Sequence, residues 1–388
     1  MRLMLSAGEA SGDNYGAMLL SELRQHTDVQ AFGLGGAKMA AAGCELTVDA
    51  RDVAAVGITE IVRHIPRIYA SYRRLVDALR TRKPDALVLI DFPDVNFKLA
   101  RHAHRLGIPV IYFVSPQLWA WKPWRLRLVQ RYVTKMLVIF PFEEGFYRER
   151  NVDAEFVGHP LADLPLPDIS REQFANEHGL QPGKPWIALL PGSRGGEVRL
   201  NLPEMCRAAA IMGNAYEYIV PVASTLDRGF VASQVGGAAK LTLVPGAEAR
   251  AVMLHARASV VASGTATVEA ALIGNPFVVV YRVSGLTYAV GKRLVSLDNY
   301  AMVNLIAGRT ILPELIQENF TAEKVVEQLR PLLADTDERE QMMRDLAEVK
   351  QKLRRSDAGD RNAITRTASA VLSAVGVTVA SGTLDPAN

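Results

Sequence analysis

Short apolar runs alternate with longer amphipathic segments along the chain up to about residue 280. A strand that is buried on both faces carries few polar residues, so this alternation is typical of parallel sheets covered by helices. We expect strands at Arg2–Leu5, Gln30–Leu34, Ala86–Ile90, Val110–Val114, Met136–Ile139 and Glu155–Val157, and then at Trp186–Leu190, Tyr218–Pro221, Leu241–Val244, Ala258–Ala262 and Phe277–Tyr281.

The stretch between these two series, residues 159–185, contains five prolines and many polar residues, which suits a linker between domains. A chain of 388 residues also exceeds the size at which one hydrophobic core usually stops growing. The sequence therefore predicts an α/β protein with two doubly wound, Rossmann-like halves that face one cleft. After about Thr321 the chain becomes strongly helical, and these helices could pack across both halves.

Composition narrows the classes of partner. The 44 Lys and Arg against 41 Asp and Glu leave a formal charge of +3, too little to indicate nucleic acid as the main partner. The two cysteines, Cys44 and Cys206, have neither metal-ligand nor redox spacing. No signal peptide precedes the first apolar run and every long apolar run is interrupted, so we expect a cytoplasmic protein whose membrane contact is peripheral.

In the second half, Ser263, Gly264 and Thr265 follow a predicted strand and open a helical segment. Backbone N–H groups at such a turn, together with the positive end of the helix dipole, can bind a diphosphate. Glu269 lies about one turn further on, where its carboxylate could accept hydrogen bonds from a ribose diol. The alternative is an ordinary helix that Ser263 or Thr265 caps, with Glu269 as a surface charge.

A second loop of the same kind contains Gly192, Ser193 and Arg194 and follows the strand that begins at Trp186. Glycine lets the backbone approach a ligand closely, and a guanidinium matches the geometry of phosphate oxygens. Positive charge at this point would stabilise the charge that grows on a departing diphosphate. The alternative is a turn in which Arg194 pairs with Glu197 on the surface.

The first half supplies carboxylates at the corresponding strand ends. Asp91 follows the strand that ends at Ile90, and Glu9 follows the first strand. Asp91 is our candidate for a general base that activates a sugar hydroxyl, with Glu9 second. We assign Asp94 to the N-cap of a helix that begins near Asn96, and we favour Asp13 as the cap of the first helix.

Three of the four tryptophans, Trp119, Trp121 and Trp124, lie beside Lys122 and Arg125. Amphipathic rings next to cations suit a membrane interface or an anionic, greasy ligand, but we favour core packing by Trp119 and Trp121, with a solvated basic helix after them.

Together these loops resemble the lipid-A-disaccharide synthases, the inverting glycosyltransferases of the lipid A pathway. The resemblance covers about the first 375 residues and rests on Ser6–Asp13, Asp91–Asn96, Ser115–Trp121, Pro191–Gly195 and Ser263–Thr267. The chain departs from the family at Met302-Val303-Asn304, where the family often has Leu-Pro-Asn.

The resemblance implies a GT-B architecture. It implies an acceptor-binding domain over residues 1–165, a UDP-sugar-binding domain over 166–345, helices over 346–375 that return to the first domain or are exchanged in a homodimer, and a disordered tail over 376–388.

The reaction that the resemblance implies moves 2,3-diacylglucosamine from UDP-2,3-diacylglucosamine to 2,3-diacylglucosamine 1-phosphate at the inner face of the inner membrane, with no metal and no cofactor. The residues implied are Asp91, Glu9 and Arg194 for catalysis, Gly192, Ser193, Arg194, Ser263, Gly264, Thr265, Glu269 and Asn304 for the nucleotide, and Asp94, Asn96, Trp119 and Trp121 for the acceptor or its acyl chains.

Two other functions remain open on sequence alone. A UDP-sugar 2-epimerase of the same architecture would also hold a nucleotide in its second domain. A non-catalytic, nucleotide-regulated membrane-binding protein could retain the helix after Ser263 without any role for Asp91 or Glu9.

Overall fold

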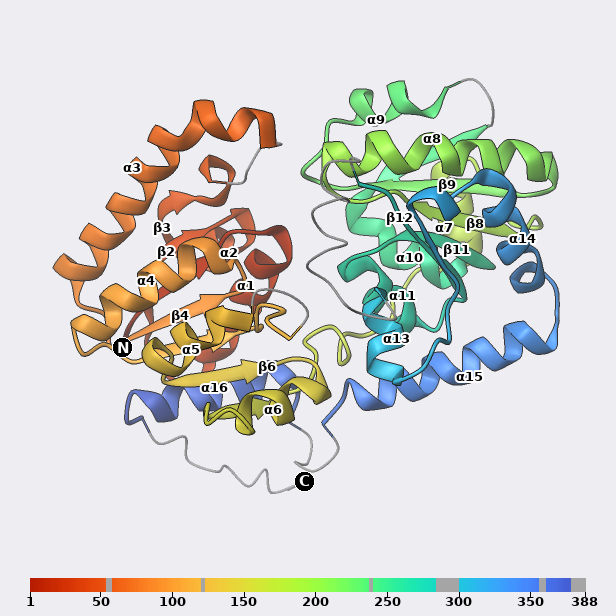
Figure 1. Ribbon diagram of the computed structural model, residues 1–388. Coiled ribbons are helices and arrows are strands. Elements are labelled where there is room, and N and C mark those ends of the chain that lie inside the picture. Colours follow the sequence, from red (N-terminus) through yellow and green to blue (C-terminus); the bar gives the residue numbers. More distant parts are fainter. Residues whose placement is uncertain (54–57, 120–122, 237–239, 284–299, 356–360, 378–388) are drawn as a thin grey trace, which may run out of the picture. The chain divides into compact units, whose positions relative to one another are not determined.

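The computed structural model describes residues 1–53, 58–119, 123–236, 240–283, 300–355 and 361–377. They form two compact units, shown in Figure 1. The first unit contains Met1–Asp163 and the chain from Leu353 onward, and the second contains Leu164–Lys352. The predicted domain boundaries follow residues 165 and 345, whereas the chain passes between the units after Asp163 and after Lys352. The predicted tail falls largely outside the described part of the chain.

The first unit is built on a parallel sheet of seven strands in the order β3-β2-β1-β4-β5-β6-β7. The chain first adds strands outward from β1 and then restarts on the other side of it at β4. The strands are β1 (Arg2–Ala7), β2 (Gln30–Gly35), β3 (Glu45–Asp49), β4 (Ala86–Ile90), β5 (Val110–Phe113), β6 (Lys135–Val138) and β7 (Ala154–Phe156).

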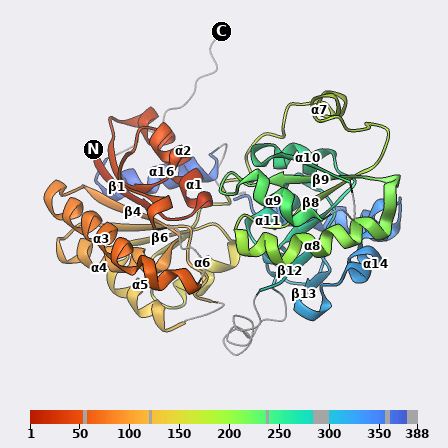
Figure 2. The same ribbon diagram turned by 90° about the horizontal axis from the view of Figure 1, so that it is seen from above.

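Helices cover both faces of this sheet (Figures 1 and 2). Side chains alternate between the faces of a strand, so Leu89 joins the core beneath α3, α4 and α5 while Ile90 meets α1 at Gly12 and Gly16. The helices are α1 (Ala10–His26), α2 (Ala37–Ala41), α3 (Ile58–Arg82), α4 (Pro93–Arg105), α5 (Leu126–Tyr132), α6 (Pro141–Arg148) and α16 (Ala363–Ala374), with 3₁₀ turns η1 (Ala50–Asp52) and η2 (Pro123–Arg125).

The second unit repeats the arrangement with six parallel strands in the order β10-β9-β8-β11-β12-β13. Its strands are β8 (Trp186–Leu190), β9 (Glu217–Val222), β10 (Leu241–Pro245), β11 (Ala258–Ala262), β12 (Phe277–Tyr281) and β13 (Glu314–Ile316). Its helices are α7 (Arg171–His178), α8 (Gly195–Met212), α9 (Arg228–Val235), α10 (Ala249–His255), α11 (Thr265–Ile273), α13 (Met302–Ala307), α14 (Ala322–Leu333) and α15 (Asp337–Lys352), with 3₁₀ turns η3 (Gly213–Ala215), η4 (Gly246–Glu248) and η5 (Gln317–Asn319).

Strands β3 and β13 and helix α7 were not predicted. Strands β3 and β13 lie at sheet edges, where half-exposed polar residues replace the apolar run that marks an interior strand. The proline-rich stretch also contains α7, which begins after Ser170 because the Ser170 hydroxyl accepts a hydrogen bond from the Gln173 N–H.

The C-terminal helices divide between the units. Helix α15 belongs wholly to the second unit, so the predicted boundary after residue 345 falls inside a single helix. Helix α16 packs against α1 in the first unit. Within the part of the chain that the structure describes, none of the helices has the length and apolar character needed to cross a bilayer.

Candidate active site

In each sheet, the predicted loops follow the two strands between which the strand order reverses. Where strand order reverses, the loops after two adjacent strands diverge and leave a crevice at the carboxyl edge of the sheet. In the first unit this switch point lies between β1 and β4, which carry Glu9 and Asp91. In the second unit it lies between β8 and β11, which carry Arg194 and Gly264. The strand order thus makes neighbours of the loops after β1 and β4 in the first unit, and of the loops after β8 and β11 in the second.

The backbone at Asp91 is unusual. Asp91 and Phe92 both have a φ of 46°, a left-handed conformation that is rare for residues other than glycine. The Asp91 carbonyl accepts hydrogen bonds at 2.7 Å from the Tyr112 hydroxyl and from the Asn96 amide. Its N–H lies 3.3 Å from the carbonyl oxygens of Phe113 and Val114. Strain that is held in this way by several partners is typical of functional positions.

Asn96 joins the two loops of this switch point. It is fully buried, and its carbonyl oxygen accepts a hydrogen bond from the Ser6 hydroxyl at 2.6 Å. The Phe92 ring lies directly over Gly8, where an added Cβ would come within 2.4 Å of the ring. The backbone next to Glu9 is therefore packed against the loop of Asp91. Asn96 acts as a positioning residue in this arrangement.

Two capping assignments were wrong. Helix α4 begins at Pro93 after Phe92, so Asp94 lies in the first turn, where its exposed carboxylate pairs with Arg125. Asp13 lies inside α1 and accepts hydrogen bonds from the backbone N–H groups of Gly36, Lys38 and Met39. It therefore caps the short α2 across the sheet edge, because a buried carboxylate needs several donors that its own helix cannot supply there.

In the second unit, Glu197 shapes the loop after β8. Its carboxylate accepts hydrogen bonds from the Ser193 N–H at 3.0 Å and the Arg194 N–H at 3.3 Å. Gly192 has a φ of 118°, and a Cβ there would strike Glu197. The Arg194 guanidinium lies 3.6 Å from Glu197 with 64% of its side chain exposed. The surface pair between Arg194 and Glu197, which was the alternative interpretation, is therefore present. The Arg194 side chain is nevertheless exposed enough to be accessible to an anion.

The loop after β11 lacks the side-chain cap that the alternative required. Gly264 is the N-cap of α11, with a φ of 150° and no capping side chain. The Thr267 N–H and hydroxyl both return to the Gly264 carbonyl, at 3.1 and 2.7 Å. Ser263, Gly264 and Thr265 are exposed or half-exposed, and Glu269 is half-buried one turn on. The helix start thus presents backbone donors as an anion site requires.

Asn304 is enclosed. Its amide donates to the Leu312 carbonyl at 3.1 Å and to Glu314 at 2.7 Å, and its carbonyl accepts from the N–H groups of Ile311 and Leu312. All of its hydrogen-bonding capacity in this structure is used to join α13 to β13. Any effect of Asn304 on a nucleotide would therefore be indirect.

The aromatic segment divides by exposure. Trp119 is half-buried and donates its indole N–H to Glu143 at 3.1 Å, with the Phe142 ring edge-on at 5.0 Å. Trp124 is 62% exposed. Trp121 lies outside the described residues. Core packing thus buries part of the Trp119 side chain, but it does not explain the exposed Trp124 side chain.

Two buried titratable groups at the carboxyl edge of the first sheet were not predicted. Burial raises the pKa of Glu143 to about 8, although hydrogen bonds from Trp119 and nearby backbone groups oppose the shift. Burial lowers the pKa of His159 to about 3. Glu143 stands beside a second glutamate in a predicted helical stretch, and His159 lies at the start of the predicted linker, so nothing in the local sequence marks either one.

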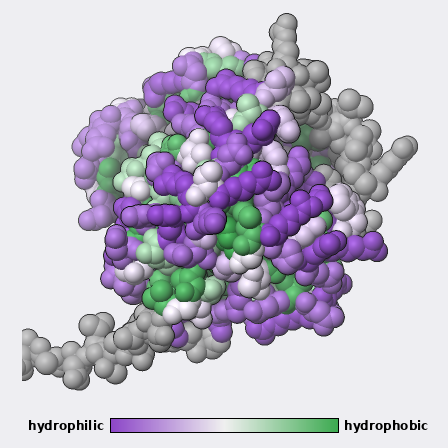
Figure 3. Space-filling view, turned by 90° about the vertical axis from the view of Figure 1, so that its left-hand side faces the viewer, coloured by the Kyte–Doolittle hydropathy of each residue, from purple (hydrophilic) through white to green (hydrophobic). Residues whose placement is uncertain are grey.

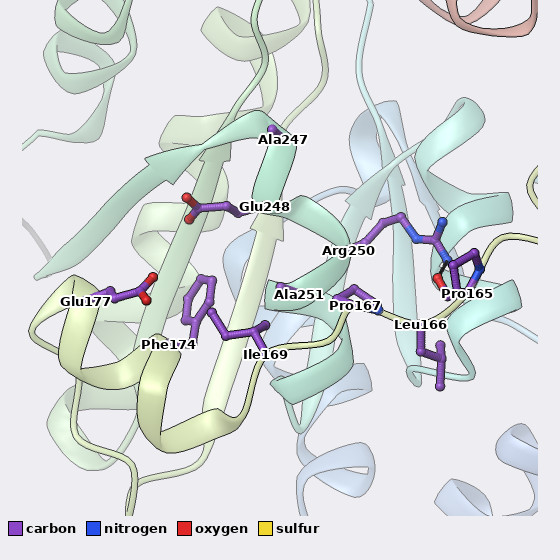
Figure 4. Close-up of a pocket in the computed structure, with 10 residues that line it drawn as sticks. All are labelled: Pro165, Leu166, Pro167, Ile169, Phe174, Glu177, Ala247, Glu248, Arg250 and Ala251. Carbon is purple, nitrogen blue, oxygen red and sulfur yellow. Dashed lines mark hydrogen bonds between the residues drawn. The ribbon is translucent and has the colours of Figure 1, made fainter. Parts of the chain in front are cut away.

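Two cavities lined by described residues lie away from the predicted loops. One of about 340 Å³ lies in the second unit between α7 and α10 (Figure 4), where Arg250 donates to the Pro165 carbonyl at 3.0 Å. Another of about 450 Å³ lies in the first unit beside α16 at the amino ends of β6 and β7. Among the residues placed by the structure, no group of three or more His, Cys, Asp or Glu side chains could hold a metal ion.

Two switch-point sheets of this kind place the chain in a known class of two-domain α/β proteins. The chain is similar to the crystal structure of CalG4, the calicheamicin glycosyltransferase, with a TM-score of 0.58, 17% identity and coverage of 97% of this chain and 98% of that one. It is also similar to UDP-GlcNAc 2-epimerase from Neisseria meningitidis bound to UDP-GlcNAc, with a TM-score of 0.61, 13% identity and coverage of 96% and 99%. These likenesses establish the GT-B type of fold.

Sequence comparison identifies the family. The family model of lipid-A-disaccharide synthetase matches residues 3–368. A lipid-A-disaccharide synthase from Acidobacterium capsulatum is 57% identical over 367 residues, which cover 90% of this chain and 91% of that protein. The chain belongs to the lipid-A-disaccharide synthetase family, and it is a glycosyltransferase.

Proposed function

We propose that the protein transfers 2,3-diacylglucosamine from UDP-2,3-diacylglucosamine to the 6-hydroxyl of 2,3-diacylglucosamine 1-phosphate, which yields a β-1,6-linked disaccharide and UDP. The observation that carries this proposal is the pairing of loops at each switch point. Carboxylates lie at the one in the first unit, and glycine-rich, cationic loops lie at the one in the second. Family membership supports the choice of substrates.

The second unit holds the donor in this proposal. The diphosphate binds the backbone N–H groups that follow Gly264, beside Gly192 and Ser193 on the adjacent strand end. Arg194 places its charge on the departing phosphate, where it stabilises the transition state more than the ground state. Glu269 accepts hydrogen bonds from the ribose hydroxyls.

In this proposal, the first unit binds the acceptor and supplies the base. The 6-oxygen of the acceptor forms a bond to the anomeric carbon while the bond from that carbon to the diphosphate breaks. The hydroxyl proton passes to the Asp91 carboxylate, and the electron pair leaves on UDP. Glu9, on the neighbouring loop, is the second candidate for the base.

Mass spectrometry of products formed from both diacyl sugars tests the proposal. We expect the disaccharide and UDP in equal amounts from the wild-type protein. Asp91→Asn should lower turnover by about 10²–10⁴-fold, the usual contribution of a general base, and should leave UDP affinity nearly unchanged. The matched control is Asp28→Asn, the same change at an exposed position before β2, on the opposite edge of the sheet.

Each result has a definite consequence. Formation of a 2-epimer of the donor without disaccharide would replace the proposal with the epimerase. UDP binding without any turnover would favour the non-catalytic protein. Full activity in Asp91→Asn would remove Asp91 from the mechanism and leave Glu9 as the base.

We further propose that the protein binds the inner face of the inner membrane through the surface of α3, α4, η2 and α5, because both substrates carry acyl chains. Tyr69 and Trp124 are 59% and 62% exposed there. In Figure 3 this side of the first unit is mostly hydrophilic, with small hydrophobic patches. Its exposed cations include Arg73, Arg74, Arg80, Lys98, Arg101, Arg105, Arg127 and Arg131.

We also propose that the protein forms a homodimer in which the two subunits exchange the C-terminal chain that contains α16. Light scattering that gives the mass of a single chain at micromolar concentration would contradict it.

A further inference from the structure

Glu143 is a buried carboxyl group that the proposed reaction does not use. It lies in the first turn of α6 with none of its surface exposed. One carboxylate oxygen accepts the Trp119 indole N–H at 3.1 Å, and the other accepts the Phe140 N–H at 3.3 Å. A buried carboxyl is costly even when it is hydrogen-bonded, whereas an apolar side chain would fill the same space at lower cost.

The contacts of Glu143 converge on Trp119. Phe142, the residue before Glu143, meets the Trp119 ring edge-on with a ring-centre distance of 5.0 Å and an angle of 90°. The indole is thus held at its N–H by the carboxyl group and at its ring by a phenyl edge. The Ser115 hydroxyl lies 2.6 Å from the Tyr147 hydroxyl, which ties the start of the same loop to α6. The aromatic loop is therefore fixed to α6 at both ends of its described part.

This loop also borders the candidate base. Strands β4, β5 and β6 are adjacent, and Ile90, Phe113 and Leu137 are in register at their carboxyl ends. The loop of Trp119 begins at Val114, whose carbonyl oxygen lies 3.3 Å from the Asp91 N–H. Helix α6 begins just beyond β6. Asp91, Trp119 and Glu143 therefore come from three consecutive loops at one edge of the sheet.

We propose that Glu143 is a positioning residue that fixes the Trp119 indole as a wall of the acceptor-sugar site beside Asp91. This inference rests on the proposed function. The amphipathic indole packs against the acceptor, either the apolar face of the sugar ring or the first carbons of its acyl chains. Glu143 itself touches no substrate.

The protonation state of Glu143 provides a readout that a purely structural residue would lack. With a pKa of about 8, the group is neutral at pH 7 and ionises as the pH rises through 8. The side chains that face it are Trp119 and Ser115, together with Tyr147, whose pKa burial holds well above its usual value. The neighbouring Glu144 pairs with Arg148 at 2.9 Å. Ionisation puts a charge among these groups and favours hydration of the site, which loosens the loop.

Steady-state kinetics with varied acceptor test the inference. Trp119→Phe keeps a ring against Phe142 but removes the N–H, and Glu143→Leu removes the acceptor of that hydrogen bond. We expect each variant to raise the KM for the acceptor about tenfold at pH 7, with kcat and the KM for the donor within about twofold of wild type. The double variant should be no worse than either single variant, because both remove the same interaction.

Glu143→Gln provides the conservative rescue. Its amide oxygen can still accept the indole N–H, so we expect an acceptor KM near that of wild type at pH 7. Between pH 7 and 9 the wild-type KM should rise while that of Glu143→Gln stays level. Trp186→Phe is the matched control, since it removes a 3.0 Å indole hydrogen bond to the Gln181 carbonyl within the other unit.

A wild-type acceptor KM in Trp119→Phe would overturn the inference, as would equal pH profiles for wild type and Glu143→Gln. Neither result would affect the proposed function, which fails only if the wild-type protein forms no disaccharide.

Discussion

Asp91 and Phe92 carry consecutive left-handed backbone angles that neither side chain favours. The conformation persists because Tyr112, Asn96 and the end of β5 hold it from three directions. At the residue scale, the buried polar groups around the candidate site position other groups. Asn96 and Asn304 join loops, and Asp13 caps a neighbouring helix. Sequence motifs marked Asn96 and Asn304 as functional without distinguishing contact with a ligand from support of the loop, and Asp13 was expected to cap its own helix.

Gly264 provides a test at this scale. Its φ of 150° strains any residue with a Cβ, although a Cβ there would meet no other atom within 4 Å. Gly264→Ala should therefore destabilise the second unit by about 1–3 kcal/mol and weaken UDP binding, because the first N–H groups of α11 would turn away from the diphosphate.

Thermal unfolding and UDP titration measure the two effects. Gly196→Ala is the matched control, since a Cβ at this position in the first turn of α8 also meets nothing within 4 Å but faces no positive φ. We expect that variant to match wild type or to gain slightly in stability. Equal behaviour of the two alanine variants would show that the strained turn is unimportant.

At the scale of elements, the two strands that were missed, β3 and β13, both lie at sheet edges, although the edge strands β7 and β10 were predicted. Strand β4 is buried at every position, so its apolar run is continuous. Strand β3 has a single buried residue and no such run. Helices in the loops follow the same logic. Helix α7 was hidden among prolines, because its pattern of apolar residues is weak and its start depends on the Ser170 cap.

We expect the surface of α3, α4, η2 and α5 to bind phospholipid vesicles. Sedimentation with vesicles of anionic and zwitterionic phospholipid should pellet the protein, and the bound fraction should fall as salt screens the arginines. Trp124→Ala should reduce binding, because the exposed ring would otherwise enter the interface. Tyr300→Ala is the control, an aromatic residue that is 42% exposed in the second unit. Equal losses from both variants would argue against this surface.

At the scale of the whole molecule, Glu143 and His159 make the stability of the first unit depend on pH. The folded unit keeps His159 neutral down to a pKa of about 3, whereas the unfolded chain protonates it below about 6.5, so stability falls as the pH drops below 6.5. Glu143 keeps its proton up to a pKa of about 8 when folded and loses it near 4.5 when unfolded, so its contribution falls as the pH rises from 4.5 to 8. Between about pH 4.5 and 6.5, a rise in pH increases the stability contribution of His159 and decreases that of Glu143.

We therefore expect the first unit to be most stable in that window, with losses of at most ~1.4 kcal/mol per pH unit on either side from one proton. Hydrogen exchange of peptides from β5–β7 measures this stability separately from that of the second unit. His159→Gln should flatten the acid side, since glutamine can still accept the Leu161 N–H, and Glu143→Gln should flatten the alkaline side. Unchanged slopes in these variants would assign the pH dependence to other groups.

The sequence by itself determined the two-sheet architecture and the loops that carry the candidate chemistry. Continuous apolar runs require burial on both faces, and parallel strands place every following loop at one edge of the sheet. Only the tertiary structure decided which loops meet, because strand order sets Glu9 beside Asp91 and Arg194 beside Gly264. It also decided the roles of Asp13, Asn304 and Glu143. Their partners lie far along the chain or across a turn, and burial, which no local pattern records, makes those contacts obligatory.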